Sequence, residues 1–379
     1  MARKRRKLIV RDRKKTFVRI VITCVSLIAL IGIAILAFFT AKSCGIKMTT
    51  RSLALNPSDM AVGSGDGIMY IRGGNMNFMS FDDEDDDFSK PLTGSSAPKG
   101  LVGTDNIKAV YSENTVQIIG GGFDIGIDGS IIALRCGSST LAVCYSHPNG
   151  DETLSVYTSA GQLLKSFDFS DGRLVDFGYS EASGTTLWIM ELDTDSGSPR
   201  TTVSTFDLDR MSSTGVITVS GQLVERIFFT NSSVFVVGTE SLIRYSSSAN
   251  REIYRILLYG YRVADISLAG DSPLLLLMPR CVSSISDISS LRLLTVSQKD
   301  VADETAVTVT LPEDAVSCHL TNGNLAVISS NAIGLYSGKG VLLEEKSLPL
   351  NATDSSKKLD EHHILMERNG EAVLLTVGK

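Results

Sequence analysis

Three side chains capable of acid–base chemistry lie at similar places in separate apolar runs of the sequence. Asp176 lies in LVDFGYS, Asp265 in VADISLAG and His319 in AVSCHLTNG. A catalytic site would need at least two of them within hydrogen-bond reach in an open pocket. No Gly-x-Ser-x-Gly elbow marks a nucleophile for a Ser-His-Asp site. If the protein is an enzyme, these three residues are the ones to follow.

The histidines and the acidic residues give only weak indications of a metal site. His362 and His363 are adjacent, but neighbours in a strand point to opposite faces, so one tetrahedral site could not easily use both. The run FDDEDDDF, from Phe81 to Phe88, offers carboxylates to calcium but lacks the Asp-x-Asp-x-Asp-Gly arrangement. A solvated loop is the favoured interpretation of this run. We assign no metal ligand.

The glycine run IIGGGFDIGIDG, from Ile118 to Gly129, resembles a phosphate-binding loop only in composition. A nucleotide loop needs a following helix whose N-terminus faces the phosphates, and its glycines follow the spacing Gly-x-Gly-x-x-Gly. Another strand is expected here, so the glycines are assigned to turns and bulges. We therefore assign no catalytic residue, no cofactor-binding residue and no cofactor.

Two of the six cysteines, Cys136 and Cys144, are expected on successive strands of one sheet. Outside the cell such a pair could form a disulfide. Two small buried thiols are at least as consistent with the sequence.

The elements that would position these residues are short strands. Residues 227–257, IFFTNSSVFVVGTESLIRYSSSANREIYRIL, hold four apolar runs rich in Val, Ile, Phe and Tyr, separated by Ser, Asn and Gly. Such runs are typical of strands joined by tight turns, and no apolar stripe at helical spacing survives the interruptions. The stretch is predicted to form a four-stranded antiparallel sheet.

The same four-run unit recurs along the chain with a period of about 46 residues. The first runs of the clear repeats begin near Ile131, Leu174, Val224, Val263 and Ala315. Such a period predicts an all-β fold, a β-propeller of about seven four-stranded blades, with six or eight as alternatives. A β-sandwich would not repeat one unit five times. The C-terminal piece supplies two strands, so N-terminal strands are expected to complete its blade and close the ring.

The N-terminal region differs from the rest. Residues 1–19 carry ten Lys or Arg and one Asp, and Ile20–Phe39 contains no charge. An uncharged helix of that length crosses a hydrocarbon core of roughly 30 Å, and the charge asymmetry places the N-terminus in the cytoplasm. A cleaved signal peptide is the alternative, although its apolar region would be shorter. The predicted organisation is a single-pass protein of the cell membrane with a basic cytoplasmic tail (1–19), a transmembrane signal-anchor helix (20–39), a juxtamembrane linker (40–52) and an extracytoplasmic propeller (53–379).

The charge of the remaining chain limits its partners. Residues 51–379 carry twenty-four Lys or Arg and forty-one Asp or Glu. This excess of acid argues against nucleic acid, which needs a basic face. It is compatible with cations or with a basic partner. The helix and basic tail are expected to contact membrane lipid.

The basic tail, the single helix and the degenerate propeller together resemble an uncharacterised family of membrane-anchored bacterial proteins related to quinoprotein-like propellers. The resemblance covers nearly the whole chain and rests on architecture. Trp188 is the single tryptophan, whereas quinoprotein propellers dock each blade with one, and the Gly-His and Trp-Asp pairs of WD40 repeats are absent. The family supplies no catalytic residues.

These observations favour a non-enzymatic function. We expect a binding or scaffold module in the cell envelope, with a protein partner. The alternative is an envelope enzyme whose site lies at the central channel, where Asp176, Asp265 and His319 would converge.

Overall fold

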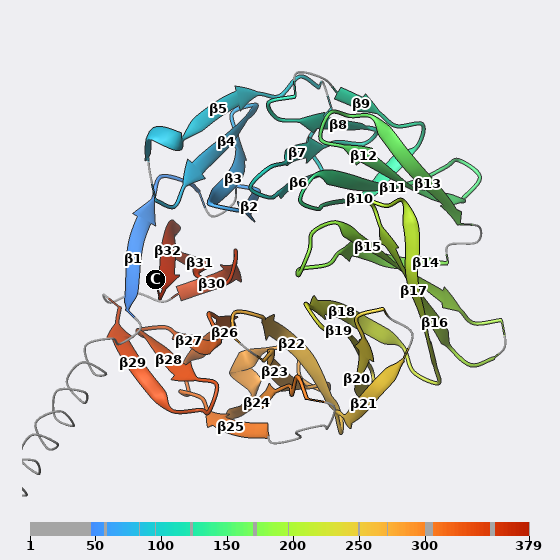
Figure 1. The fold of residues 1–379 in the computed structure, drawn as a ribbon. Coiled ribbons are helices and arrows are strands. Elements are labelled where there is room, and N and C mark those ends of the chain that lie inside the picture. Colours follow the sequence, from blue (N-terminus) through green and yellow to red (C-terminus); the bar gives the residue numbers. More distant parts are fainter. Residues whose placement is uncertain are drawn as a thin grey trace, which may run out of the picture. The chain divides into compact units, whose positions relative to one another are not determined.

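The computed structural model describes residues 47–56, 59–82, 84–94, 96–121, 124–169, 173–195, 197–248, 251–270, 272–299, 306–348 and 353–378. From Met48 onward the chain forms one unit. In it, thirty-two described strands form eight four-stranded antiparallel sheets arranged in a ring (Figure 1). The fold is therefore an eight-bladed β-propeller.

The blades are numbered in chain order. Blade 1 contains β2 (Ala61–Ser64), β3 (Gly67–Arg72), β4 (Asn75–Ser80) and β5 (Phe88–Pro91). Blade 2 contains β6 (Gly100–Gly103), β7 (Lys108–Tyr111), β8 (Thr115–Ile118) and β9 (Asp124–Gly126). Blade 3 contains β10 (Ser130–Cys136), β11 (Thr140–Ser146), β12 (Glu152–Thr158) and β13 (Leu163–Phe169). Blade 4 contains β14 (Leu174–Tyr179), β15 (Thr186–Asp193), β16 (Arg200–Asp207) and β17 (Ser212–Ser220).

The second half of the ring follows the same pattern. Blade 5 contains β18 (Val224–Thr230), β19 (Ser233–Gly238), β20 (Ser241–Ser246) and β21 (Glu252–Leu257). Blade 6 contains β22 (Tyr261–Ser267), β23 (Leu274–Pro279), β24 (Ser290–Thr295) and β25 (Ala306–Thr310). Blade 7 contains β26 (Ala315–Thr321), β27 (Asn324–Ser329), β28 (Ala332–Ser337) and β29 (Leu342–Ser347). Blade 8 contains β30 (Thr353–Lys358), β31 (His363–Arg368), β32 (Glu371–Val377) and β1 (Met48–Leu53). Two short 3-10 helices are described, η1 (Glu84–Asp86) and η2 (Ile285–Asp287).

The second strands explain why the sequence contains uninterrupted apolar runs. Every residue of β19 and β27 is buried, and so is the LLLLM run of β23. Each blade packs between two others, so both faces of a second strand are covered and both must be apolar. The outer strands β13 and β29 instead carry many exposed residues.

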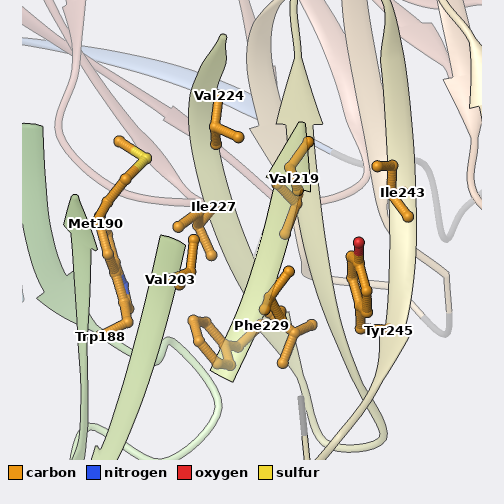
Figure 2. Packing of buried hydrophobic residues seen from close by; sticks show 12 residues of the cluster. Trp188, Met190, Val203, Val219, Val224, Ile227, Phe229, Ile243 and Tyr245 are labelled. Carbon is orange, nitrogen blue, oxygen red and sulfur yellow. The ribbon is translucent and has the colours of Figure 1, made fainter. Parts of the chain in front are cut away.

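The hydrophobic core lies between neighbouring blades. Figure 2 shows Trp188 and Val203 of blade 4 packed against Ile227 and Phe229 of blade 5. Gly178 lies under the indole ring, because a Cβ atom there would come within 2.7 Å of Trp188. Similar clusters join blades 5 and 6 and blades 6 and 7.

The predicted ring closure is confirmed, but the blade number and the expectation that the C-terminal piece supplies only two strands of the last blade were wrong. β1 pairs antiparallel with β32, from Met48 opposite Val377 to Leu53 opposite Ala372. Blade 8 therefore takes three strands from the C-terminal end and one from the N-terminal end. The ring has eight blades rather than about seven. Three strands have too few apolar residues to be recognised in the sequence as strands of a repeat. They are the short first strands of blades 1 and 2, AVGS and GLVG, and the polar β30, TDSSKK.

The structure does not support the predicted single-pass membrane topology, with a cytoplasmic N-terminus and an extracytoplasmic ring. Within the described ranges, no helix is long and apolar enough to span a bilayer. The predicted tail (1–19) and transmembrane helix (20–39) lie outside the described residues. Of the predicted linker (40–52), residues 48–52 belong to β1.

Candidate functional site

The turns that join the first and second strands of the blades lie on one face of the ring, which we call the upper face. A hollow of about 680 Å³ opens there, and we call it the mouth pocket. Its size suits a small molecule or a few side chains of a partner. Residues from blades 4, 5, 6 and 8 line it, among them Glu181, Phe229, Asn231, Leu268, Gln298 and Glu361.

A second hollow of about 250 Å³, the interblade groove, extends from the mouth pocket between blades 4 and 5. The two hollows share Ala182, Phe229, Thr230 and Asn231. Hydroxyl side chains dominate the lining of the groove, including Ser180, Ser183, Thr186, Thr205, Thr214 and Ser233. Together the hollows form a depression with carboxylates at one end and hydroxyl groups at the other.

Glu181 is the carboxylate at the blade 4 side of the mouth pocket. It lies in the turn between β14 and β15, and its Oε2 accepts a hydrogen bond of 3.0 Å from the backbone N–H of Phe229 in blade 5. Among the described residues, no Lys or Arg nitrogen comes within ion-pair distance of it. Glu181 is an exposed residue, but the protein atoms around its carboxylate exclude part of the water and raise its pKa, although its own N–H, the N–H of Phe229 and the charge of Arg226 act in the opposite direction.

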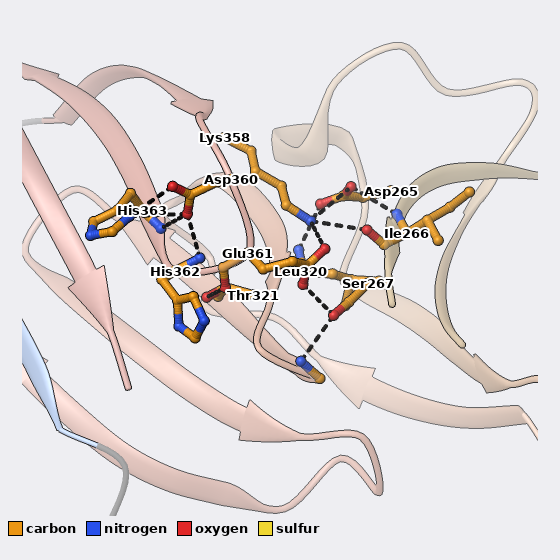
Figure 3. A network of polar contacts seen from close by, with 11 residues as sticks. Asp265, Ile266, Ser267, Leu320, Thr321, Lys358, Asp360, Glu361, His362 and His363 are labelled. Atoms are coloured by element: carbon orange, nitrogen blue, oxygen red, sulfur yellow. Dashed lines mark hydrogen bonds and ion pairs between the residues drawn. The ribbon is translucent and has the colours of Figure 1, made fainter. Parts of the chain in front are cut away.

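Glu361, on the blade 8 side of the pocket, has a different environment (Figure 3). Its Oε1 accepts a hydrogen bond of 3.1 Å from Lys358 Nζ, and its Oε2 accepts one from Ser267 Oγ. Lys358 Nζ also donates to the carbonyl of Ile266 at 2.9 Å and lies 3.7 Å from Asp265 Oδ1. This cluster, which we call the lysine network, joins blades 6 and 8 through charged side chains.

Two of the three residues expected at the central channel lie close to this network. Asp265 accepts hydrogen bonds of 2.7 Å from the backbone N–H groups of Ile266 and Leu320. His319 Nε2 lies 2.7 Å from Ser356 Oγ. Burial lowers the pKa of His319, and the charge of Lys358 acts in the same direction while that of Asp265 opposes it.

No catalytic set is formed by these residues. No hydrogen bond joins Asp265 to His319 in the described structure. Asp265 accepts from two backbone N–H groups and lies beside Lys358, whereas His319 contacts Ser356. Asp176 belongs to blade 4, where its Oδ1 lies 3.9 Å from Arg135 of blade 3 and accepts from the N–H of Phe177. The structure therefore does not bring the three side chains together in one open pocket.

Asp176 and Asp265 do share a local geometry. Each directly follows a register shift at the start of an inner strand, between Leu174 and Asp176 in β14 and between Val263 and Asp265 in β22. Such bulges bend the strand and re-aim the side chains around it. In both cases the carboxylate accepts from the next N–H along the strand, which indicates a structural role in the inner strand.

The histidine pair is part of the turn that leads into β31. His363 Nδ1 lies 2.8 Å from Asp360 Oδ2, and its ring stacks on Phe81 with centroids 3.7 Å apart. His362 Nδ1 instead lies 3.2 Å from the carbonyl of Val377. The two rings thus have separate hydrogen-bond partners. His362 lies in the turn before β31 and His363 is the first residue of that strand, so the two are not strand neighbours as the sequence suggested.

The acidic run lies between β4 and β5. Asp85, Asp86 and Asp87 are exposed, and Asp87 accepts a hydrogen bond of 2.7 Å from the N–H of Ser80. Across the ranges that the structure describes, no group of three or more His, Cys, Asp or Glu residues is arranged to hold a metal ion.

The cysteines of blade 3 are free thiols in the structure. The register places Cys144 opposite Ala133 and Cys136 opposite Leu141, so the two cysteines do not face each other across the strands. Burial raises the pKa of both thiols to about 12, which makes them unreactive at neutral pH.

Comparisons with known proteins identify the fold. No family model and no curated protein matches the sequence. The WD40 domain of SCAP from fission yeast is similar in structure, with a TM-score of 0.59 and 9% identity over 88% of this chain and 95% of that chain. The computationally designed Ika8 protein has a TM-score of 0.55 and 12% identity over 86% of this chain and 98% of that chain. The C-terminal WD40 domain of Sif2 has a TM-score of 0.51 and 9% identity over 86% of this chain and 99% of that chain.

The chain therefore has a WD40-like β-propeller fold. At these identities the likeness concerns the fold alone. None of the comparisons supports the expected bacterial quinoprotein-like family.

The residues that build the mouth pocket were not found from the sequence. Glu181 and Phe229 are 48 positions apart, and each lies at the end of an apolar run without any motif around it. Only the position of Glu181 and Phe229 within the repeats could have indicated that they meet. Both belong to the end of a first strand or to the turn after it, and those turns meet at the upper face.

Proposed function

We propose that the protein is a binding module that recognises a segment of another protein at its upper face. The observation that carries this proposal is the continuity of the mouth pocket and the interblade groove, which share four residues and differ in chemistry from end to end. An extended peptide could place one side chain in the pocket and use the hydroxyl groups of the groove as hydrogen-bond partners.

Two further observations support a protein partner. WD40-like propellers commonly serve as binding or scaffold modules, which is an argument by analogy of fold. No hydrogen bond joins the candidate acid–base residues Asp265 and His319 in the described structure, and Asp176 lies beside Arg135, so a binding role fits these residues better than a catalytic set.

A photo-crosslinking experiment tests the proposal. A photoreactive amino acid replaces the exposed Asn231 in the full-length chain, expressed in its own cells, and the adducts are identified by mass spectrometry. Ala269→Arg places a long side chain in the mouth pocket, and Ala160→Arg makes the same change at an exposed alanine in the turn between β12 and β13. We expect Ala269→Arg to abolish a discrete protein adduct that Ala160→Arg leaves intact. If the two variants give the same adducts, the mouth pocket is not the binding site.

A further inference from the structure

Glu181 differs from the other carboxylates around the central channel. Glu361 and Asp265 both lie beside the Lys358 ammonium, at 3.1 Å and 3.7 Å, and so have a cation within the protein. Glu181 accepts hydrogen bonds only from uncharged backbone groups in the described structure, and Arg226 acts on it only through its field. Glu181 is an exposed residue in the lining of the pocket, and a carboxylate is stabilised when an opposite charge is brought beside it. The mouth pocket thus contains a negative charge that the described chain does not neutralise with an ion pair.

The walls around Glu181 are suited to the stem of a long side chain. Phe229, Leu268 and Pro273 line the same hollow, and they present apolar surface beside the carboxylate. Lysine and arginine bury their methylene stems against apolar surface while the charged head reaches a polar partner. A volume of about 680 Å³ leaves room for such a side chain and the backbone that bears it.

A divalent cation does not fit these groups as well. Calcium takes six to eight oxygen ligands and magnesium requires a near-octahedral set. Glu361 is already paired with Lys358, which leaves Glu181 as the one carboxylate among the described residues of the pocket without an ion-pair partner. The overall charge also favours a basic partner, since residues 51–379 carry forty-one acidic and twenty-four basic residues.

We infer that the mouth pocket receives a lysine or arginine side chain of the partner protein, with its cationic head at the Glu181 carboxylate and its stem against Phe229, Leu268 and Pro273. This inference rests on the proposed function and specifies the chemistry of the partner. Basic charge steers the approach, and the neutral hydroxyl groove receives the flanking peptide.

The test compares four capped peptides of the sequence Gly-Ser-X-Ser-Gly, in which X is arginine, lysine, citrulline or glutamate. Citrulline has the shape of arginine without its charge. Binding to the full-length chain is followed by NMR chemical shifts up to millimolar peptide. We expect the arginine and lysine peptides to bind at least about tenfold more tightly than the citrulline peptide, and the glutamate peptide to be the weakest.

Glu181→Gln and Glu371→Gln serve as a matched pair of variants. The amide that replaces the carboxylate in Glu181→Gln can still accept from the N–H of Phe229 but carries no charge. Glu371 is exposed at the start of β32, outside the mouth pocket. We expect Glu181→Gln to remove the preference for arginine over citrulline and Glu371→Gln to preserve it. In the unmodified chain, the arginine peptide should also lower the apparent pKa of Glu181, because the cation favours the charged carboxylate.

Two results would overturn the inference. One is an arginine peptide that binds no better than citrulline or gives no shift at millimolar concentration. The other is a preference that survives Glu181→Gln. In either case, the proposed function would stand if Ala269→Arg still abolished the protein adduct in the photo-crosslinking experiment. That experiment does not depend on the charge of the partner.

Discussion

The lysine network makes a quantitative prediction about stability. In Lys358→Met the stem keeps its volume, but Glu361 and Asp265 lose their shared cation and the carbonyl of Ile266 loses a donor. Removing one member of a buried ion pair costs about 3–5 kcal/mol. The side chains of Lys358 and Asp265 are 18% and 19% exposed and that of Glu361 is 32% exposed, so water screens part of this cost. We expect Lys358→Met to lower the free energy of unfolding by about 2 kcal/mol.

A double-mutant cycle separates the charge effect from general damage. Glu361→Gln alone leaves Lys358 beside Asp265, and in the Lys358→Met background it removes one of the two uncompensated charges. Urea denaturation of the four proteins should therefore give a coupling energy of about 1 kcal/mol, with the double variant more stable than the sum of the single changes implies. Additivity within about 0.5 kcal/mol would refute the reasoning, because the network would then be a set of independent contacts.

Three other changes test the ring, a strained turn and a titrating group. Leu55 is 4% exposed in the cluster that joins blades 8 and 1, so Leu55→Ala should lower the free energy of unfolding by about 2–4 kcal/mol in the same denaturation assay. Leu343 is 48% exposed, and Leu343→Ala should change that free energy by less than about 0.5 kcal/mol. Tyr259 has a φ of +47° ahead of Gly260 and is 72% exposed, so Tyr259→Asn should raise the melting temperature, by an amount equivalent to about 0.5–1 kcal/mol, and a fall would contradict the assignment of strain. Burial acts to raise the pKa of Asp360, but hydrogen bonds from the His363 side chain and nearby backbone outweigh it and hold the pKa below its ordinary 3.8. The stabilisation is therefore present above about pH 4 and is lost as the pH falls through the lowered pKa. The Asp360→Asn variant should be less stable than the unmodified protein at neutral pH, and this difference in unfolding free energy should shrink in acid. A difference that stays constant from neutral to acid pH would exclude this role of Asp360.

The class of fold and most of the repeats follow from local sequence patterns. The clear repeats were expected to begin near Leu174, Val224 and Ala315, and β14, β18 and β26 begin at those residues. The reason is that a second strand packed on both faces must be apolar throughout, which leaves a strong local signal such as LLLLMP or LAVISS. Turn residues then mark the ends of the runs.

The number of blades and the composition of the last one depend on contacts between distant segments. The polar strand β30 forms because β31 offers it an edge, and β1 forms the outer strand of blade 8 because β32 has an unpaired edge of its own. Pairing between such segments depends on backbone hydrogen bonds, which are the same for every residue type except proline. Their sequences therefore carry little information about the partner strand.

The candidate site likewise arises only in the folded ring. Glu181 and Phe229, like Lys358 and Asp265, meet only because turns and inner strands of different blades converge at its centre. A lone glutamate in a turn has the same local sequence pattern whether it stands on an open surface or lines a pocket. Its chemistry depends on which charges surround it, and that is set by the number and order of the blades.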